Sequence, residues 1–278
     1  MHHRGRPFLW TDVDGMQDLG TLPGDDYAHA HDINDQGLIV GCSGSSPDTE
    51  RGFLWDPANG MQPFMELSGG YDLRPRDINN QGQVLGYVSE VGTVLWSPTG
   101  SIQPLGESPI GTPLIPMDLN DQGQVAGFYL GADGHPRHAF LWDSINGLLD
   151  LGDLPGGEDY ARAWGLDSGG GVVGASSGVH DTAEPFLWTA EAGMMTLNDL
   201  LEPGSPSILF GDARAISDSG RIAVASSYQA FVLTPVPEPA SLCLLGFGAI
   251  ALLRRNRLGY FAPRQCATNP APRSNSSR

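Results

Sequence analysis

The chain has 278 residues, enough for one large domain with a sizeable core. It carries 15 basic residues, all arginine, against 32 acidic residues, for a net charge of −17. Residues 1–253 hold nine of the arginines and every acidic residue. This strongly acidic charge argues against nucleic acid and anionic membranes as partners, because both require basic patches.

An apolar triplet recurs along the first 234 residues. It ends in Trp10, Trp55, Trp96, Trp142 and Trp188, and residues 231–233 form a sixth copy without tryptophan. The copies are spaced by 45, 41, 46, 46 and 45 residues. A period in the forties is typical of one four-stranded blade of a β-propeller.

Each repeat is predicted to contain four short strands. The first strand ends near Ile33, Ile78, Leu119, Leu166 and Ile216. The turn that follows is rich in Asn, Asp and Gly, which tolerate the left-handed conformations of tight hairpins. The second strand follows this turn, and the apolar triplet forms the third. The fourth strand is predicted at 16–19, 61–64, 102–105, 148–151 and 194–197.

Five turns and five fourth strands predict an all-β domain over residues 1–234, a β-propeller of about five four-stranded blades. The last copy, 213–233, lacks a fourth strand of its own, while the N-terminus begins with a spare third and fourth strand. We therefore expect residues 16–19 to complete the last blade and close the ring. An open or larger ring is the alternative.

Several repeated phrases resemble the HAF repeat of bacterial extracellular proteins. They are the His-Ala-Phe-Leu-Trp phrase at 138–142, the Asp-Leu-Gly-Thr-Leu-Pro-Gly phrase at 18–24 and the Asp-Ile-Asn-Asp-Gln-Gly phrase at 32–37. The resemblance covers residues 7–234. Only one copy keeps the literal His-Ala-Phe, and the fourth turn, at 167–170, reads Asp-Ser-Gly-Gly in place of Asn-Asp-Gln-Gly. It implies an exported, propeller-like protein with no general activity.

The turn motif also overlaps the start of an EF-hand calcium loop at 32–37, 77–82 and 118–123. An EF-hand requires a bidentate glutamate at position twelve. The corresponding positions hold Ser43, Val88 and Tyr129. These motifs are therefore interpreted as hairpin turns, with a weak calcium site of another kind as the alternative.

Two further motifs suggest chemistry but lack essential parts. Residues 174–178 match Gly-x-Ser-x-Gly, yet no helix follows, as a nucleophile elbow would require. His29 and His31 alternate on a predicted strand, with Asp25 and Asp26 upstream, but no third metal ligand can be named. We assign no catalytic, cofactor-binding or metal-binding residue, and we expect no cofactor and no enzyme activity. A site assembled from several blades in the central funnel would escape this reasoning.

After residue 234 the sequence changes character. Pro237, Glu238 and Pro239 end the strand pattern, and residues 240–253 follow without a charge. Fourteen residues fall short of the ~20 that cross a bilayer upright, so a buried helix is the alternative to a short transmembrane helix. The cluster of Arg254, Arg255 and Arg257 favours the membrane, with this end in the cytoplasm and the propeller outside.

This tail, residues 235–257, resembles the PEP-CTERM sorting signal of Gram-negative bacteria that make exopolysaccharide. The resemblance implies recognition of Pro237, Glu238 and Pro239 by an exosortase in the inner membrane, with topology set by the arginine cluster. A plain C-terminal anchor without processing is the alternative. Residues 258–278 extend beyond the usual end of such a signal, and are expected to be either a sequence artefact or a disordered tail.

Together these features predict an exported protein of the cell envelope, cell surface or extracellular matrix. We expect a structural or binding role, with exopolysaccharide or surface proteins as candidate partners and no role in nucleic acid binding. Export requires a signal peptide, and no apolar segment follows Met1 and the basic residues, so the true start is expected upstream. The alternatives are a secreted propeller enzyme, a polysaccharide lyase or hydrolase, and a cytosolic interaction propeller.

Overall fold

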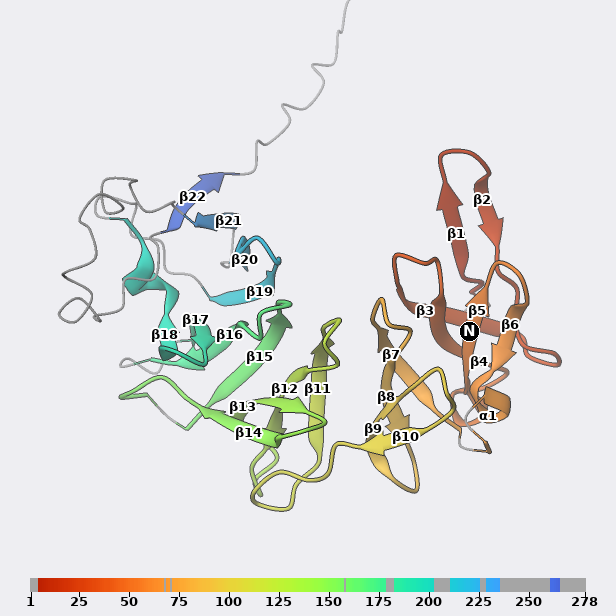
Figure 1. Cartoon of the computed structure of the whole chain (residues 1–278), viewed down its shortest axis with the longest axis horizontal. Helices are drawn as coiled ribbons and strands as arrows, with labels where there is room; N and C mark the ends of the chain where they lie inside the picture. The colour runs from red at the N-terminus through yellow and green to blue at the C-terminus, as the bar shows by residue number, and fades with distance from the viewer. Residues whose placement is uncertain are drawn as a thin grey trace, which may run out of the picture.

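The computed structural model describes residues 5–67, 69–70, 72–157, 159–178, 183–202, 211–225, 229–235 and 261–265. Within these residues the chain forms five four-stranded antiparallel sheets and one two-stranded sheet, with almost no helix. The sheets follow one another along an arc, each in the position of a propeller blade (Figure 1). The prediction of an all-β fold with about five four-stranded blades is confirmed.

Each four-stranded sheet is built from strands in sequence order. The first contains β3 (Tyr27–Ile33), β4 (Ile39–Gly44), β5 (Arg51–Asp56) and β6 (Gly60–Pro63). The second contains β7 (Arg74–Ile78), β8 (Val84–Val88), β9 (Gly92–Trp96) and β10 (Ile102–Pro104). The third contains β11 (Leu114–Leu119), β12 (Val125–Leu130), β13 (Pro136–Asp143) and β14 (Gly147–Gly152).

The fourth sheet contains β15 (Ala161–Leu166), β16 (Val172–Ser177), β17 (Ala183–Thr189) and β18 (Gly193–Thr196). The fifth contains β19 (Asp212–Ile216), β20 (Ile222–Ala225), β21 (Ala230–Pro235) and β22 (Phe261–Gln265). Short helical turns are α1 (Phe64–Leu67), η1 (Pro47–Thr49) and η2 (Leu197–Leu200). The first strand of every sheet ends at the residue predicted from the repeat.

The turn between the first and second strands is organised by an asparagine and a glycine. In the first sheet, Asn34 Oδ1 accepts hydrogen bonds from the backbone N–H groups of Gln36 and Leu38, both at 3.0 Å. Gly37 has a φ of 76°, in the left-handed region that favours glycine. The interpretation of residues 32–37 as a hairpin turn is therefore confirmed.

The hydrophobic core lies between neighbouring sheets, and in the first four of the four-stranded sheets a glycine of the second strand makes the packing possible. In the third sheet, Gly127 pairs with Phe140, whose side chain is fully buried. A Cβ at Gly127 would lie 2.9 Å from the Phe140 ring and 2.2 Å from the carbonyl oxygen of Ile115. The Gly41–Phe53 and Gly174–Phe186 pairs repeat this arrangement.

The N-terminal strands do not complete the last blade, which corrects the predicted ring closure. β1 (Phe8–Thr11) and β2 (Gly15–Asp18) pair only with each other and form a hairpin at one end of the arc (Figure 1). Leu19 and Leu22, which follow β2, are buried with Phe53 in the core of the first sheet. This anchoring holds the hairpin beside β3, so it cannot reach β21 at the other end.

The fourth position of the last sheet is instead occupied by β22, which pairs with β21. β22 lies within residues 258–278, for which the sequence suggested a disordered tail. Pro237, Glu238, Pro239, the apolar segment 240–253 and the arginines Arg254, Arg255 and Arg257 all lie outside the described residues. In the part of the chain that the structure describes, no helix is long and apolar enough to cross a membrane.

Candidate functional site

The first strands of the sheets, β3, β7, β11, β15 and β19, lie on the inner side of the arc (Figure 1). Each carries a β-bulge at the same place, between the second-last and fourth-last residues of the strand. A bulge leaves one residue outside the ladder and re-aims its side chain. These residues, here named the bulge row, are His31, Arg76, Met117, Trp164 and Arg214.

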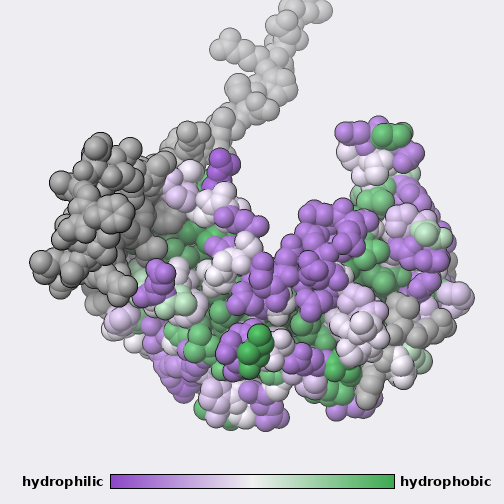
Figure 2. Space-filling model, viewed as in Figure 1, coloured by the Kyte–Doolittle hydropathy of each residue, from purple (hydrophilic) through white to green (hydrophobic). Residues whose placement is uncertain are grey.

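Side chains of the bulge row reach from one sheet to the next. His31 Nδ1 donates a hydrogen bond of 2.6 Å to the Pro75 carbonyl, and Arg76 Nη2 lies 3.2 Å from Met117 Sδ. The Arg214 guanidinium lies 4.7 Å from the centroid of the Trp164 ring, within cation–π range. The bulge row and the first-strand residues beside it, Arg74 and Arg162, are here named the inner strip. Hydrophilic residues gather beside the notch between the arms of the arc (Figure 2).

A cavity of about 710 Å³ opens against this strip, lined by His31, Arg76, Met117 and three aspartates. The aspartates immediately follow the bulge residues and are Asp32, Asp77 and Asp118. Asp32 Oδ2 accepts the backbone N–H of Ile78 at 2.9 Å. Asp118 Oδ2 accepts the N–H of Leu166 at 2.7 Å. These two carboxylates therefore tie each inner strand to that of the following sheet.

Asp77 differs from the other two. Leu119, the residue of the next sheet that would correspond to Ile78, donates its backbone N–H to Asp118 and not to Asp77. Burial, and then a hydrogen bond to the Asp32 carboxyl group, raise the pKa of Asp77 to about 8. At neutral pH the Asp77 side chain is therefore a protonated acid that donates to Asp32. Burial also raises the pKa of Asp118.

Below the aspartates, the turn asparagines form a ladder along the inner edge. Asn34 Nδ2 donates to the carbonyl of Asn79 at 3.0 Å, and Asn79 Nδ2 donates to the carbonyl of Asn120 at 2.9 Å. Asn120 Nδ2 continues the ladder to the carbonyl of Asp167 at 2.9 Å. Each turn of the repeat therefore fixes its neighbour, which explains why the turn recurs with so little change.

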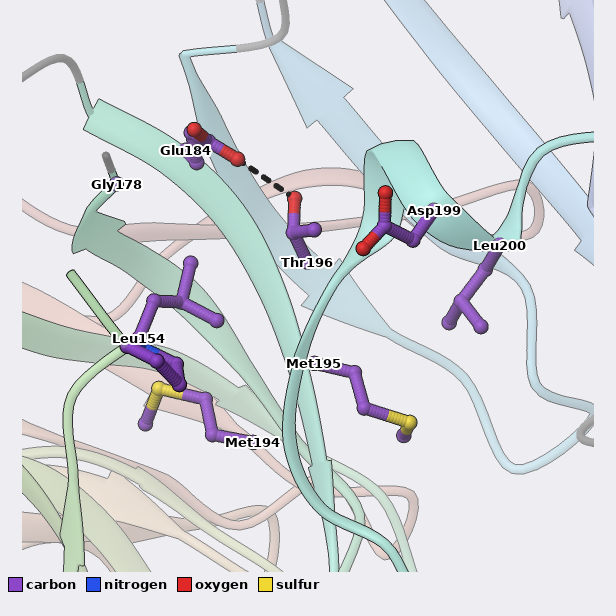
Figure 3. Close-up of a pocket in the computed structure, with 9 residues that line it drawn as sticks. Leu154, Gly178, Glu184, Met194, Met195, Thr196, Asp199 and Leu200 are labelled. Atoms are coloured by element: carbon purple, nitrogen blue, oxygen red, sulfur yellow. Dashed lines mark hydrogen bonds between the residues drawn. The ribbon is translucent and has the colours of Figure 1, made fainter. Parts of the chain in front are cut away.

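A second cavity, of about 400 Å³, lies at the outer side of the fourth sheet (Figure 3). Leu154, Met194 and Met195 form its apolar part, while Glu184 and Asp199 lie at the other end. The Thr196 hydroxyl donates to a Glu184 carboxylate oxygen at 2.9 Å. These residue types suit an apolar ligand that carries a hydrogen-bond donor. Only the fourth sheet builds this cavity, whereas every sheet contributes to the inner strip.

The histidine of the His-Ala-Phe phrase lies in a polar cluster at the edge of the third sheet. His138 Nδ1 is 2.8 Å from Asp150 Oδ1, and its Nε2 is 2.6 Å from Asp159 Oδ1. Tyr129 donates its hydroxyl to Asp150 at 2.8 Å. Burial opposes ionisation of Asp150, but hydrogen bonds from His138, the Gly152 N–H and Tyr129 hold its pKa below the usual value. His138 thus links β13 and β14 to the loop that enters the fourth sheet.

A double-mutant cycle on His138 and Asp150 should give a coupling free energy of about 1–2 kcal/mol, because the pair is partly buried and hydrogen-bonded. The matched control is Arg6 with Asp18, which occupy the same positions relative to Phe8 as this pair does to Phe140. That ion pair is exposed, with side chains 59% and 52% accessible, so its coupling should be much smaller. Urea denaturation measures both cycles, and equal couplings would contradict a role for burial.

The other motifs noted in the sequence have structural partners. Ser176, in the Gly-x-Ser-x-Gly match, is fully buried, accepts the Leu154 N–H at 2.9 Å and donates to the Tyr160 carbonyl at 2.9 Å. His31 lies at the bulge, and His29 stacks at 5.3 Å from the Tyr27 ring. Among the described residues, no group of three or more His, Cys, Asp or Glu side chains is placed to hold a metal ion.

Sequence reasoning missed the bulge row. The sequence does mark this position, because each bulge residue stands immediately before the last two residues of its strand, as Arg76 stands before Asp77 and Ile78. The residue type changes at every copy, so the position did not stand out as a repeat. Only the bulge, which the sequence does not specify, brings His31, Arg76 and Met117 to one cavity.

Residues 235–257 match the family described as the PEP-CTERM protein-sorting motif, which confirms the signal predicted for this segment and supports exosortase-dependent export. No curated protein matches the chain. The chain is similar to the solved structure of XC5397 from Xanthomonas campestris, described as a gluconolactonase important in glucose secondary metabolic pathways. The identity is 10%, with 74% of this chain and 73% of that chain covered and a TM-score of 0.41. A likeness at this level says nothing about activity.

Proposed function

We propose that this chain is an exported protein of the cell envelope or extracellular matrix, whose repeat array binds a surface polymer or protein. The observation that carries the proposal is the PEP-CTERM match at 235–257, which begins where β21 ends. Pro237, Glu238 and Pro239 are the residues read by the exosortase. Arg254, Arg255 and Arg257 keep their end of the apolar segment in the cytoplasm, which places residues 1–234 outside.

The architecture and the sequence phrases support a binding role. A row of blade-like sheets offers an extended inner surface, as repeat arrays commonly do for macromolecular partners. The resemblance of residues 7–234 to the HAF repeat of extracellular proteins points to the same compartment. The strongly acidic charge of residues 1–253 suits a soluble surface protein with no affinity for nucleic acid.

The inner carboxyl groups favour binding over polysaccharide cleavage. A glycosidase holds its two carboxyl groups about 5–9.5 Å apart, so that a sugar carbon or a water fits between them. Asp77 and Asp32 instead share a direct hydrogen bond. Asp32 and Asp118 also accept backbone N–H groups of the following sheets, which gives them a structural role.

The sorting motif can be tested by replacing Glu238 with alanine in the full chain, expressed behind a secretion leader in a bacterium that carries an exosortase. Wild-type protein should lose its C-terminal peptides and reach the envelope or medium. The Glu238→Ala variant should keep them and remain in the inner membrane, because the altered motif is no longer recognised. Mass spectrometry of C-terminal peptides and cell fractionation measure the two effects.

Glu191→Ala is the matched control, because Glu191 is an exposed glutamate in the array and should be processed like wild type. Processing of both variants to the same extent would contradict recognition of the motif. Soluble wild-type protein in the cytosol with Arg278 intact would overturn the export proposal and favour a cytosolic interaction propeller.

A further inference from the structure

The arginines of this acidic protein are concentrated on the inner strands. Nine arginines lie in residues 1–253, and four of them belong to β7, β15 and β19. Arg74, Arg76 and Arg214 are exposed, and Arg162 is half-buried. Since acidic residues outnumber basic ones more than twofold, most arginines should find a carboxylate. The inner strands are therefore a place where unpaired positive charge would be unexpected.

Three of these four arginines nevertheless have no carboxylate partner. Within the described residues, ion pairs to carboxylates are formed by Arg6, Arg51, Arg137 and Arg214, but not by Arg74, Arg76 or Arg162. The aspartate next to Arg76 does not neutralise it either, because Asp77 holds its proton at neutral pH. Asp32 and Asp118, which line the cavity with Arg76, are held by backbone N–H groups of the following sheets. The guanidinium groups of Arg74, Arg76 and Arg162 are therefore left without a paired carboxylate.

Two hydrogen-bond donors beside this charge also lack acceptors. The Arg162 guanidinium lies 5.3–5.9 Å from the ring centroids of Phe128, Tyr160 and Trp164. Its Nε and the Trp164 Nε1 are buried and have no hydrogen-bond partner among the residues described. Buried donors without a partner are rare in native proteins, and each requires an explanation. Arg162 also lines a cavity of about 470 Å³ with Arg137 and Asp159, which gives a ligand access to it.

We infer that the inner strip binds an acidic polysaccharide, a linear glycan with uronate carboxylates, through Arg74, Arg76, Arg162 and Arg214 together with Trp164. Guanidinium groups pair bidentately with carboxylates, and the hydroxyl oxygens of a glycan supply acceptors for the unpartnered donors. The Trp164 ring lies 4.7 Å from the Arg214 guanidinium and 5.9 Å from that of Arg162, which holds both groups side by side for a carboxylate ligand. The inference rests on the proposed function, because such glycans are met outside the cell.

The charge of the whole chain favours a glycan over nucleic acid. Double-stranded DNA carries one charge about every 1.7 Å, and its binding requires neutralisation by many basic residues. A protein with a net charge of −17 repels any polyanion beyond the strip, and it repels densely charged DNA more strongly than a sparsely charged glycan. A uronate polymer has at most one carboxylate per sugar and many neutral hydroxyl groups, so four arginines suffice to match its charge over several sugars.

The test is calorimetric titration of the purified full chain with oligogalacturonate and with the same oligomer after reduction of its carboxyl groups. Wild-type protein should bind the uronate form, less tightly at high salt, and should bind the reduced form at least about tenfold more weakly. Arg74→Gln and Arg76→Gln should each weaken binding about five- to tenfold, and the double variant by about thirtyfold or more. Arg6→Gln, on the N-terminal hairpin, should bind as wild type.

Unchanged melting temperatures of these exposed-site variants would show that the loss is not due to unfolding. Equal binding of the two oligomers, or equal affinity of Arg76→Gln and wild type, would overturn the inference. Tighter binding of a single-stranded oligonucleotide than of oligogalacturonate would also overturn it. Because this assay needs no exosortase, a failure here leaves the sorting experiment unaffected, and a sorting failure leaves this result unaffected.

Discussion

Replacing Gly127 with alanine is expected to destabilise the protein by about 3 kcal/mol or more. The new Cβ would lie 2.2 Å from the Ile115 carbonyl oxygen and 2.9 Å from the Phe140 ring. The carbonyl belongs to β11, which is hydrogen-bonded to β12, and the Phe140 side chain is fully buried. Neither neighbour can move without loss of sheet pairing or core packing. Guanidinium denaturation followed by circular dichroism measures the change.

Gly211→Ala provides the control for this substitution. Among the residues that the structure describes, a Cβ at Gly211 would meet only the Ala225 carbonyl oxygen, at an ordinary 3.4 Å. Its free energy of unfolding should therefore lie within about 0.5 kcal/mol of wild type. Equal stability of the two variants would mean that the third sheet tolerates a side chain under Phe140, and that glycine is not required for the packing of the repeat.

The architecture could be predicted because two local signals agree. The tryptophan spacing gives the period of one blade, and the turn glycines mark where the first strand ends and the second begins. Ile33, Ile78 and Leu119 end their strands as predicted because the following asparagine closes the turn on its own backbone. These hydrogen bonds join residues only a few positions apart, so they can be predicted from the sequence.

The ends of the arc could not be predicted, because they depend on contacts far apart in the chain. Trp10 stands in the same triplet as Trp142, yet Trp10 is 60% exposed and Trp142 is 3% exposed. The difference arises because β1 lacks the second strand against which Trp142 packs. Nothing in the triplet itself reveals whether a partner strand is present. The same limit explains why β22 was not expected beside β21.

The inner strip was hidden for a different reason. One position of the repeat holds His31, Arg76, Met117 and Trp164 in successive copies. The side-chain type differs from each copy to the next, so comparing the copies does not single this position out. The raised pKa of Asp77 was also invisible, because Asp32, Asp77 and Asp118 look alike in sequence. What separates them is the choice of hydrogen-bond donor in the neighbouring sheet, which is a three-dimensional property.

Replacing Asp77 with asparagine is expected to make the stability of the protein less sensitive to pH between about 4 and 8. The pKa of Asp77 is raised from 3.8 to about 8 in the folded protein, first by burial and then by its hydrogen bond with Asp32. The folded state therefore holds this proton more tightly than the unfolded state. The stability contributed by the group is fully present below pH 4 and is lost as the pH rises through about 8. Each pKa unit corresponds to about 1.4 kcal/mol.

Asparagine keeps a neutral group of the same shape that still donates to Asp32, so Asp77→Asn should match wild type near pH 4 and exceed its stability by several kcal/mol at pH 9.

Asp143→Asn is the control of opposite sign. Hydrogen bonds from Asn146 lower the pKa of Asp143, so its contribution is present above about pH 4 and lost in acid. That variant should be slightly less stable at pH 7, by a few tenths of a kcal/mol, because the site is near the surface. Parallel stability curves for wild type and Asp77→Asn from pH 5 to 9 would mean that Asp77 is ionised in the fold. The inner strip would then hold its arginines beside a charged carboxylate, which weakens the case for an anionic ligand.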